Sequence, residues 1–532
     1  MRSTSLEKLP RYLLDLTTAA QNGQVRLVET KGLQDLFHMR TSSFSRDQGF
    51  TGLIPYAAIS YCWGYSMDNT YPQKTLKENL QARLNGFPLE HLPRTLRDAV
   101  RVCQALGLMY LWIDAVCIIQ DGDDLEPQVR DMAKVYEAAH VVISAASASD
   151  ANEGFLGPRR QNYEQYELPI TFHFPDTDQT ETGRVRIVPC IPDDNSEPID
   201  ARGWTWQEHR AALRLIRFES GGIKWSCKMK NEHESGLKFK SDRLLSGYGR
   251  EGAFKKYLEE VEIYSFRETG RADDKLAAFE ISAIRISEHL GLGADDYRAG
   301  LLKPDLRRQL LWSCDLNHPQ KPPASLPSWS WANSRFPVSW DAEDMQYLDW
   351  VDFSCVIEDC TTELSEPGRP FGSVKSGQLV VRGYAPEAFW TGSILIEGPW
   401  LRRHSPRLEE RERANRKKTT KSPDGGVPPR RRTVPPKGWI VHRPLPFYPT
   451  WDTPEPPPPQ VVKCLEIRSG IGCALCNAYG IVLAPAGEGL FKRIGYFRFE
   501  HPRKRYPSIP PPSRRISFNW IHKSKRETVC II

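Results

Sequence analysis

The sequence lacks several features that would place the chain in a membrane or in the secretory pathway. No run of about 18 consecutive apolar residues occurs, so no transmembrane helix is predicted. The opening stretch, MRSTSLEKLPRYLLDL, carries acidic side chains and no apolar core, which excludes a secretory signal there. No Asn-x-Ser/Thr triplet is present, as is typical of proteins that are not glycosylated. We therefore expect a cytoplasmic protein that does not enter membranes.

The chain also lacks the usual signatures of nucleotide and metal sites. No Gly-x-x-x-x-Gly-Lys-Ser/Thr motif occurs, which excludes a P-loop. The cysteines are scattered through apolar stretches and indicate reduced core thiols rather than metal ligands. We expect neither a metal nor a resident cofactor.

Positive charge is present but is confined to two segments. The net charge of the whole chain is +6, whereas residues 402–437 carry +9 and residues 501–532 carry +7. The remainder is acidic, at −10. The two basic segments are rich in proline and arginine, which favours solvated segments without regular structure. The alternative is nuclear import through the insert at 402–437. Aromatic residues do not interleave with the basic clusters, so nucleic-acid binding is not expected.

At 532 residues the chain is too long for a single hydrophobic core. The patterning predicts an α/β fold, in which a parallel sheet flanked by helices is followed by a helical segment and a smaller β-rich C-terminal domain. The predicted parts are an N-terminal segment (1–50), an α/β domain (51–220), a mainly helical extension (221–345), a β-rich domain (346–500) that contains the basic insert, and a basic tail (501–532).

Strand-like and helix-like stretches alternate within the α/β domain. YAAISYCWG (56–64), YLWIDAVCII (110–119) and HVVISAAS (140–147) are apolar and predict buried strands. Two amphipathic helices are predicted between them, over 92–107 with Thr95 as N-cap and over 124–140. Strands joined by such helices form right-handed crossovers in a parallel sheet.

One aspartate stands out in this pattern. Asp114 lies within the apolar run YLWIDAVCII, where an unsatisfied carboxylate would cost several kcal/mol. Ligands of parallel sheets bind at the carboxyl ends of the strands, which is where Ser60, Tyr61, Trp63 and Gly64 are also expected. Asp114 either contacts a ligand there or accepts hydrogen bonds that lock the strand to a loop.

Several motifs together resemble the heterokaryon-incompatibility (HET) domain of filamentous fungi. They are YAAISYCWG, LPRTLRDAV, YLWIDAVCIIQD, MAKVYEAAHVVISAAS, GFLGP and RGWTWQE, in the order and wording of the family over roughly 56–213. The chain departs from the family pattern at Ala115 and Trp206, and neither change removes an ionisable group. The resemblance implies fungal non-self recognition that ends in growth arrest or cell death, with protein partners of an incompatibility system and self-association.

The HET domain is in turn distantly similar to the TIR domain, some members of which hydrolyse NAD. In WTWQE, Glu208 follows a tryptophan by four positions, as the catalytic glutamate does in the TIR pattern. This similarity implies an alternative function, an NAD-consuming hydrolase with Glu208 as the catalytic carboxylate and Asp114 as a ribose-contacting group. Ser60, Tyr61, Trp63 and Gly64 would then line the NAD site. The competing interpretation is that Glu208 favours the first turn of its own helix and that the tryptophans anchor the core.

Overall fold

The computed structural model divides the chain into two compact units. The first comprises residues 1–248, 267–269 and 278–282, and the second comprises 249–266, 270–277 and 283–532. The residues that the structure describes are 9–31, 33, 54–64, 73–158, 166–173, 180–187, 197–236, 238, 245, 247–322, 324–340, 352–390, 395–397, 449–455, 457–458, 460–469, 478–499 and 524–532. The basic insert predicted at 402–437 lies outside them.

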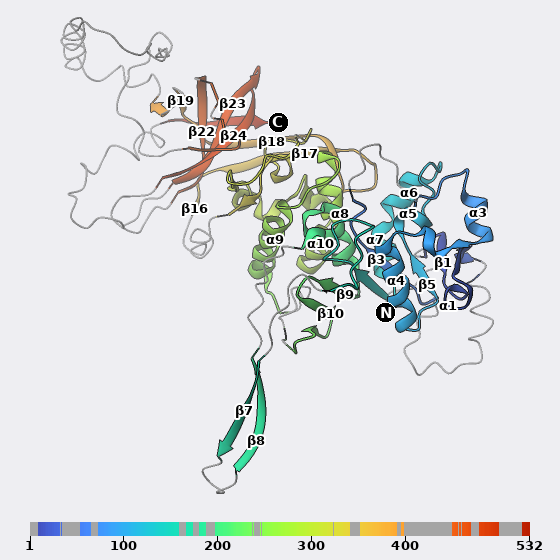
Figure 1. Ribbon diagram of the computed structural model, residues 1–532. Helices are drawn as coiled ribbons and strands as arrows, with labels where there is room; N and C mark the ends of the chain where they lie inside the picture. The colour runs from blue at the N-terminus through green and yellow to red at the C-terminus, as the bar shows by residue number, and fades with distance from the viewer. Residues whose placement is uncertain are drawn as a thin grey trace, which may run out of the picture. The chain divides into compact units, whose positions relative to one another are not determined.

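A nine-stranded sheet forms the centre of the first unit, with strand order β11-β10-β9-β6-β3-β5-β1-β2-β4 (Figure 1). Its strands are β1 (Tyr12–Asp15), β2 (Gln24–Glu29), β3 (Ala57–Ser60), β4 (Phe87–Pro88), β5 (Tyr110–Trp112), β6 (Val141–Ser144), β9 (Arg214–Glu219), β10 (Gly222–Cys227) and β11 (Asn231–His233). The four central strands β9, β6, β3 and β5 are mutually parallel; β3, β5 and β6 were predicted, whereas β9 was not.

The outer strands of this sheet are antiparallel, so the sheet is mixed rather than purely parallel as predicted. On one side, β9 turns back into β10 through the two residues Ser220 and Gly221, and a connection this short allows only antiparallel pairing. On the other side, β1 and β2 come from the N-terminal segment and pair antiparallel next to β5.

Helices pack against the strands of this sheet. They are α1 (Ala19–Asn22), α3 (Leu80–Asn85), α4 (Arg94–Ala105), α5 (Asp114–Cys117), α6 (Leu125–Arg130), α7 (Met132–Ala138) and α8 (Gly203–Ala211). Helix α4 contacts β3 and β5, whereas α8 contacts α7 and β3. Because β5 and β6 lie on opposite sides of β3, right-handed crossovers place α4 on one face of the sheet and α7 with α8 on the other.

Three predicted boundaries were wrong. The run 110–119 is not one strand, because β5 ends at Trp112 and Asp114 begins the one-turn helix α5. The helix predicted over 124–140 is divided at Asp131 into α6 and α7. Helix α4 begins at Arg94 after Pro93, and Thr95 is not its cap, because the Thr95 hydroxyl donates instead to the carbonyl of Asp150 at 3.0 Å.

A separate two-stranded hairpin belongs to the first unit. It consists of β7 (Tyr166–His173) and β8 (Thr180–Ile187), which pair antiparallel. A short 3-10 turn, η4 (Pro198–Ala201), precedes α8. Among the described residues, none of the helices combines the length and the apolar character that crossing a bilayer requires.

The second unit contains two long helices and a large sheet. The helices are α9 (Arg250–Ser265) and α10 (Lys275–Leu290), followed by the short α11 (Leu306–Gln309). The short strand pairs are β12 (Tyr297–Arg298) with β13 (Leu301–Leu302), and β14 (Ser313–Cys314) with β15 (Val338–Ser339). The helical and β-rich regions expected after the α/β domain are therefore present.

The sheet of the second unit has the strand order β17-β18-β25-β24-β23-β22-β19-β20, with β16 paired to β22 and β21 paired to β24. The strands are β16 (Asp352–Phe353), β17 (Val356–Leu364), β18 (Val374–Tyr384), β19 (Glu387–Trp390), β20 (Leu395–Glu397), β21 (Pro449–Trp451), β22 (Gln460–Ser469), β23 (Ala478–Gly487), β24 (Leu490–Phe499) and β25 (Arg526–Ile531). Strand β25 lies in the predicted basic tail, so the expectation of a tail without regular structure does not hold for residues 526–531.

Candidate functional site

The predicted site residues of the motifs YAAISYCWG and YLWIDAVCIIQD meet at one edge of the sheet. Strand β3 ends at Ser60 and is followed by Tyr61, Trp63 and Gly64, and its parallel neighbour β5 ends two residues before Asp114. The carboxyl ends of parallel strands lie at the same edge, so the two motifs converge there. This is the edge at which α/β sheets bind their ligands.

Asp114 is held by hydrogen bonds from both sides. Its Oδ1 accepts a hydrogen bond from the backbone N–H of Ala115 at 2.7 Å, and its Oδ2 accepts one from the indole Nε1–H of Trp63 at 2.8 Å. Burial raises the pKa of Asp114, while the bond from Trp63 and the charge of Arg202 oppose that shift. The carboxylate in the apolar run is therefore an anchor that ties the loop after β3 to the end of β5.

Glu208 lies on α8 and is buried, with 5% of its surface exposed. Burial raises its pKa to about 7, and the negative charge of Asp114 adds to this shift. The hydroxyls of Ser60 and Tyr136 and the charge of Arg202 act in the opposite direction. The structure thus brings the two predicted carboxyl groups close enough that the charge of Asp114 affects the protonation of Glu208.

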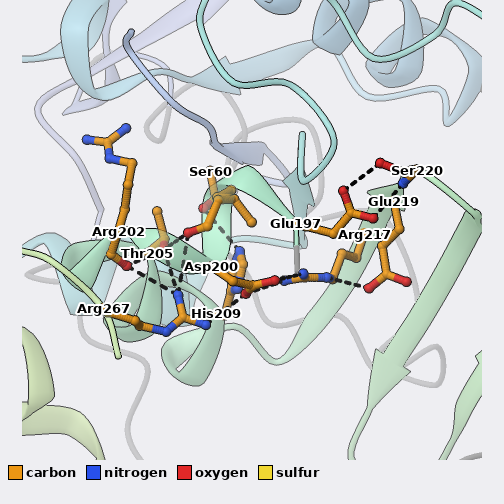
Figure 2. Close-up of polar contacts among 11 residues, drawn as sticks. Ser60, Glu197, Asp200, Arg202, Thr205, His209, Arg217, Glu219, Ser220 and Arg267 are labelled. Carbon is orange, nitrogen blue, oxygen red and sulfur yellow. Dashed lines mark hydrogen bonds and ion pairs between the residues drawn. The ribbon is translucent and has the colours of Figure 1, made fainter. Parts of the chain in front are cut away.

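Ser60 and Arg202 complete the surroundings of the two acids. The Ser60 hydroxyl lies 3.2 Å from Nε2 of His209, and the two side chains face each other in Figure 2. The guanidinium of Arg202 donates a hydrogen bond to the carbonyl of Tyr61 at 2.6 Å. Arg202 immediately precedes α8, and its positive charge lowers the pKa of both acids.

Two buried polar atoms at this edge, the Ser144 hydroxyl and Oε2 of Glu208, have no hydrogen-bond partner within the described part of the chain. The Tyr61 hydroxyl, in contrast, acts on the pKa of Asp114 through a hydrogen bond. Ser144 ends β6 and is in register with Ser60 on the adjacent parallel strand. The two atoms therefore lie at the same strand edge as the two coupled acids.

The remaining predicted residues are positioned by packing. Gly64 has φ of +93°, and a Cβ there would lie 2.7 Å from the Cβ of Asp150, so this position requires glycine. Trp206 is buried, donates from its indole N–H to the Ser282 hydroxyl at 3.0 Å and stacks on Phe279. Trp206 is therefore a core residue. Glycine at position 64 lets the backbone there lie close to Asp150.

Sequence reasoning missed a buried charge cluster beside α8. Asp200, in η4, accepts hydrogen bonds from two arginines, namely Arg217 of β9 at 3.1 Å and Arg267 at 2.8 Å (Figure 2). Arg217 also contacts Glu219, and Arg267 also donates to the Thr205 hydroxyl at 3.1 Å. The side chains of Asp200 and Arg267 are 5% and 6% exposed, so the ion pair is buried. The cluster fixes the turn that leads into α8 and hence the placement of Glu208.

Two further motifs also contact each other. Asp98 of α4 accepts hydrogen bonds from the backbone N–H groups of Phe155 and Leu156, at 3.0 and 3.2 Å. The Thr95 hydroxyl accepts one from the N–H of Gly154 at 3.0 Å. The motif LPRTLRDAV therefore holds the loop of the motif GFLGP against the N-terminal turns of α4.

The family comparison covers this region. Residues 56–208 match the family model described as heterokaryon incompatibility protein (HET), and they include all six predicted site residues. No curated protein and no solved structure matches the chain significantly. The edge that gathers Asp114 and Glu208 is thus part of a HET domain, which this chain carries at residues 56–208.

Proposed function

We propose that this chain is an effector of heterokaryon incompatibility in a filamentous fungus and signals non-self recognition through its HET domain. The outcome of the signal is growth arrest or death of the incompatible cell. The observation that carries the proposal is the family match over residues 56–208, which spans the whole strand edge with its coupled acids. Protein partners of an incompatibility system and self-association belong to the same proposal.

The working part of the effector is the cluster around Glu208 and Asp114. Its support is the position of two buried, electrostatically coupled carboxyl groups at the edge where the parallel strands end. A carboxyl group with a pKa of about 7 is also half-protonated near neutral pH, so it can donate or accept a hydrogen bond.

Inducible expression in a filamentous fungus tests the effector proposal. The wild-type chain is expected to arrest colony growth, and Asp114→Ala is expected to abolish the arrest, because it removes the acceptor that ties Trp63 to β5. Glu126→Gln, at an exposed acid in the first turn of α6, is the matched control and should arrest growth as the wild type does. Equal protein levels are verified by immunoblot. Normal growth with the folded wild-type chain would contradict the proposal.

A second candidate function is NAD hydrolysis at the same edge, and the proximity of two carboxyl groups favours it. In that reaction the bond between ribose C1′ and the nicotinamide nitrogen breaks, and its electron pair leaves with nicotinamide. Water then adds at C1′ and loses a proton. The Glu208 carboxylate would stabilise the positive charge on the ribose, as in glycosidases, and Asp114 would contact the ribose. Because Glu208 is buried, the substrate would reach it only after the side chains that cover it move.

NAD levels separate the two candidates. Under the hydrolase alternative, NAD falls after induction of the wild type but not of Glu208→Gln, whereas Glu126→Gln behaves as the wild type. Growth arrest with unchanged NAD leaves the signalling role and excludes the hydrolase.

Localisation is tested in the same strains. We expect cytoplasmic fluorescence of a tagged chain. A nuclear signal that disappears on deletion of 402–437 would support the import alternative.

A further inference from the structure

A pocket in the first unit lies at residues that the proposed function does not use. It has a volume of about 280 Å³, and its lining includes Arg94, Glu153, Phe155, Phe218, Glu219 and Ile223. The lining also includes the whole of the motif GFLGP, and Arg94 is the first of the two arginines of the motif LPRTLRDAV. This volume is close to the lower end of the range for small-molecule sites, about 300 Å³.

Arg94 supplies the positive charge of the pocket. Within the described part of the chain its guanidinium forms neither a hydrogen bond nor an ion pair, although it lines the pocket. The two acids of the lining are already engaged: Glu153 accepts hydrogen bonds from the backbone and side chain of Ser149, and Glu219 pairs with Arg217. Both carboxylates thus already have donors, whereas the N–H groups of the Arg94 guanidinium are available to a ligand.

The two glycines of the loop leave room for this arginine. A Cβ on Gly154 would lie 2.7 Å from Nε of Arg94, and a Cβ on Gly157 would lie 3.4 Å from its Nη2. The Arg94 side chain therefore runs along the backbone of the loop. Asp98 holds that backbone through the N–H groups of Phe155 and Leu156. Loop and arginine are positioned together by α4, as a preorganised binding site requires.

An aromatic pair forms the apolar wall. The rings of Phe155 and Phe218 pack with their centroids 4.7 Å apart, and both side chains are only half-buried. Ile223 of β10 and Pro158 extend the same apolar lining. A planar apolar group can stack against such a wall while its charged end reaches the guanidinium.

We infer that this pocket binds a small molecule that joins an oxyanion, such as a phosphate or carboxylate group, to a flat apolar ring. Arg94 contacts the oxyanion and the Phe155–Phe218 wall contacts the ring. The site is independent of the Glu208–Asp114 cluster, so its test neither requires nor excludes the proposed function.

Calorimetric titration of the full chain with two probes, phenyl phosphate and benzoate, tests the inference. Inorganic phosphate and phenol, which each carry only one of the two groups, are the comparisons. We expect phenyl phosphate or benzoate to bind more tightly than phosphate or phenol alone. Arg94→Gln should weaken the binding about tenfold or more, because a charge-assisted hydrogen bond is lost. Arg97→Gln, on the same helix but outside the pocket lining, is the matched control and should leave affinity unchanged.

A second variant guards against an effect on folding. Ile223→Trp fills the pocket from β10 and should abolish binding while the Arg94 charge is retained. The thermal unfolding midpoints of the three variants are compared with that of the wild type. Arg94→Gln is expected to keep the wild-type midpoint, because the Arg94 side chain is exposed and has no partner among the described residues. Unchanged affinity in Arg94→Gln or in Ile223→Trp, or no binding of either probe to the wild type, would overturn the inference.

Discussion

At the scale of single residues, protonation of Glu208 is the property with the widest consequences. Its pKa is raised to about 7 in the folded chain by burial first and by the charge of Asp114 second. In the unfolded chain the group titrates near its ordinary value of about 4.3. The folded state therefore holds a proton on Glu208 over a range of pH in which the unfolded state has released it.

This difference predicts how stability changes with pH. As the pH rises from about 4 to about 7, the unfolded chain loses the proton first, so the free energy of unfolding falls, by about 3–4 kcal/mol in total. Above pH 7 both states are ionised and the loss is complete. Glu208→Gln removes this dependence, so its thermal unfolding midpoint, relative to wild type, should rise as the pH increases from 5 to 8.

Calorimetry of the full chain at several pH values checks this expectation. Glu126→Gln changes an exposed acid of the same domain and should give a pH profile parallel to that of the wild type. Parallel profiles for wild type and Glu208→Gln would instead show that Glu208 is already ionised well below neutral pH.

The sequence predicts some residues of this edge and not others, for a physical reason. Asp114 stands out because its neighbours are apolar, and Glu208 stands out through a motif. Asp200 and Arg267 carry no such signal, because each lies in an ordinary polar stretch and they come together only after folding. Their pairing depends on contacts between segments 67 residues apart.

At the scale of elements, the central parallel strands were predictable and their ends were not. Apolar runs identify β3, β5 and β6, but an apolar run does not distinguish a buried strand from a buried helical turn. For this reason the turn that starts at Asp114 was assigned to a strand. The antiparallel outer strands β1 and β2 were not predicted, because β1 joins the sheet by pairing with β5, which is distant from it in sequence.

The turn η4 should be sensitive to the loss of its charge. Asp200→Asn removes the negative charge that faces Arg217 and the buried Arg267. Breaking a buried ion pair on one side costs about 3–5 kcal/mol. We expect the thermal unfolding midpoint to fall by several degrees.

An exposed pair provides the control for this variant. Asp131→Asn breaks the ion pair with Lys134, whose two side chains are 48% and 54% exposed, and it should cost less than about 1 kcal/mol. Equal effects of the two substitutions would show that Asp200 contributes no more than a surface acid does.

At the scale of the whole molecule, each unit is built on its own sheet. The sheet of the second unit includes β25, which comes from the end of the sequence. In the second unit, β25 lies between β18, to which it is antiparallel, and β24, to which it is parallel. Its Val529 and Ile531 are buried, while Thr528 faces outward. The alternation was overlooked because these residues follow a strongly basic segment.

Substitutions on the two faces of β25 test its role. Val529→Asn places an amide in the core, where an unpaired polar group costs about 3 kcal/mol, and should lower the unfolding midpoint and the soluble yield. Thr528→Asn, one residue away on the exposed face, should change both by little. Similar behaviour of the two variants would mean that β25 does not contribute to the core.

The position of β25 also orders events during synthesis of the chain. The unit that contains the HET domain is complete once the ribosome has passed residue 282, whereas β18 and β24 acquire the strand between them only after residue 531 has emerged. At elongation rates of about 5–20 residues per second, the two times differ by roughly ten to fifty seconds. The first unit can therefore fold while the sheet of the second unit still lacks β25.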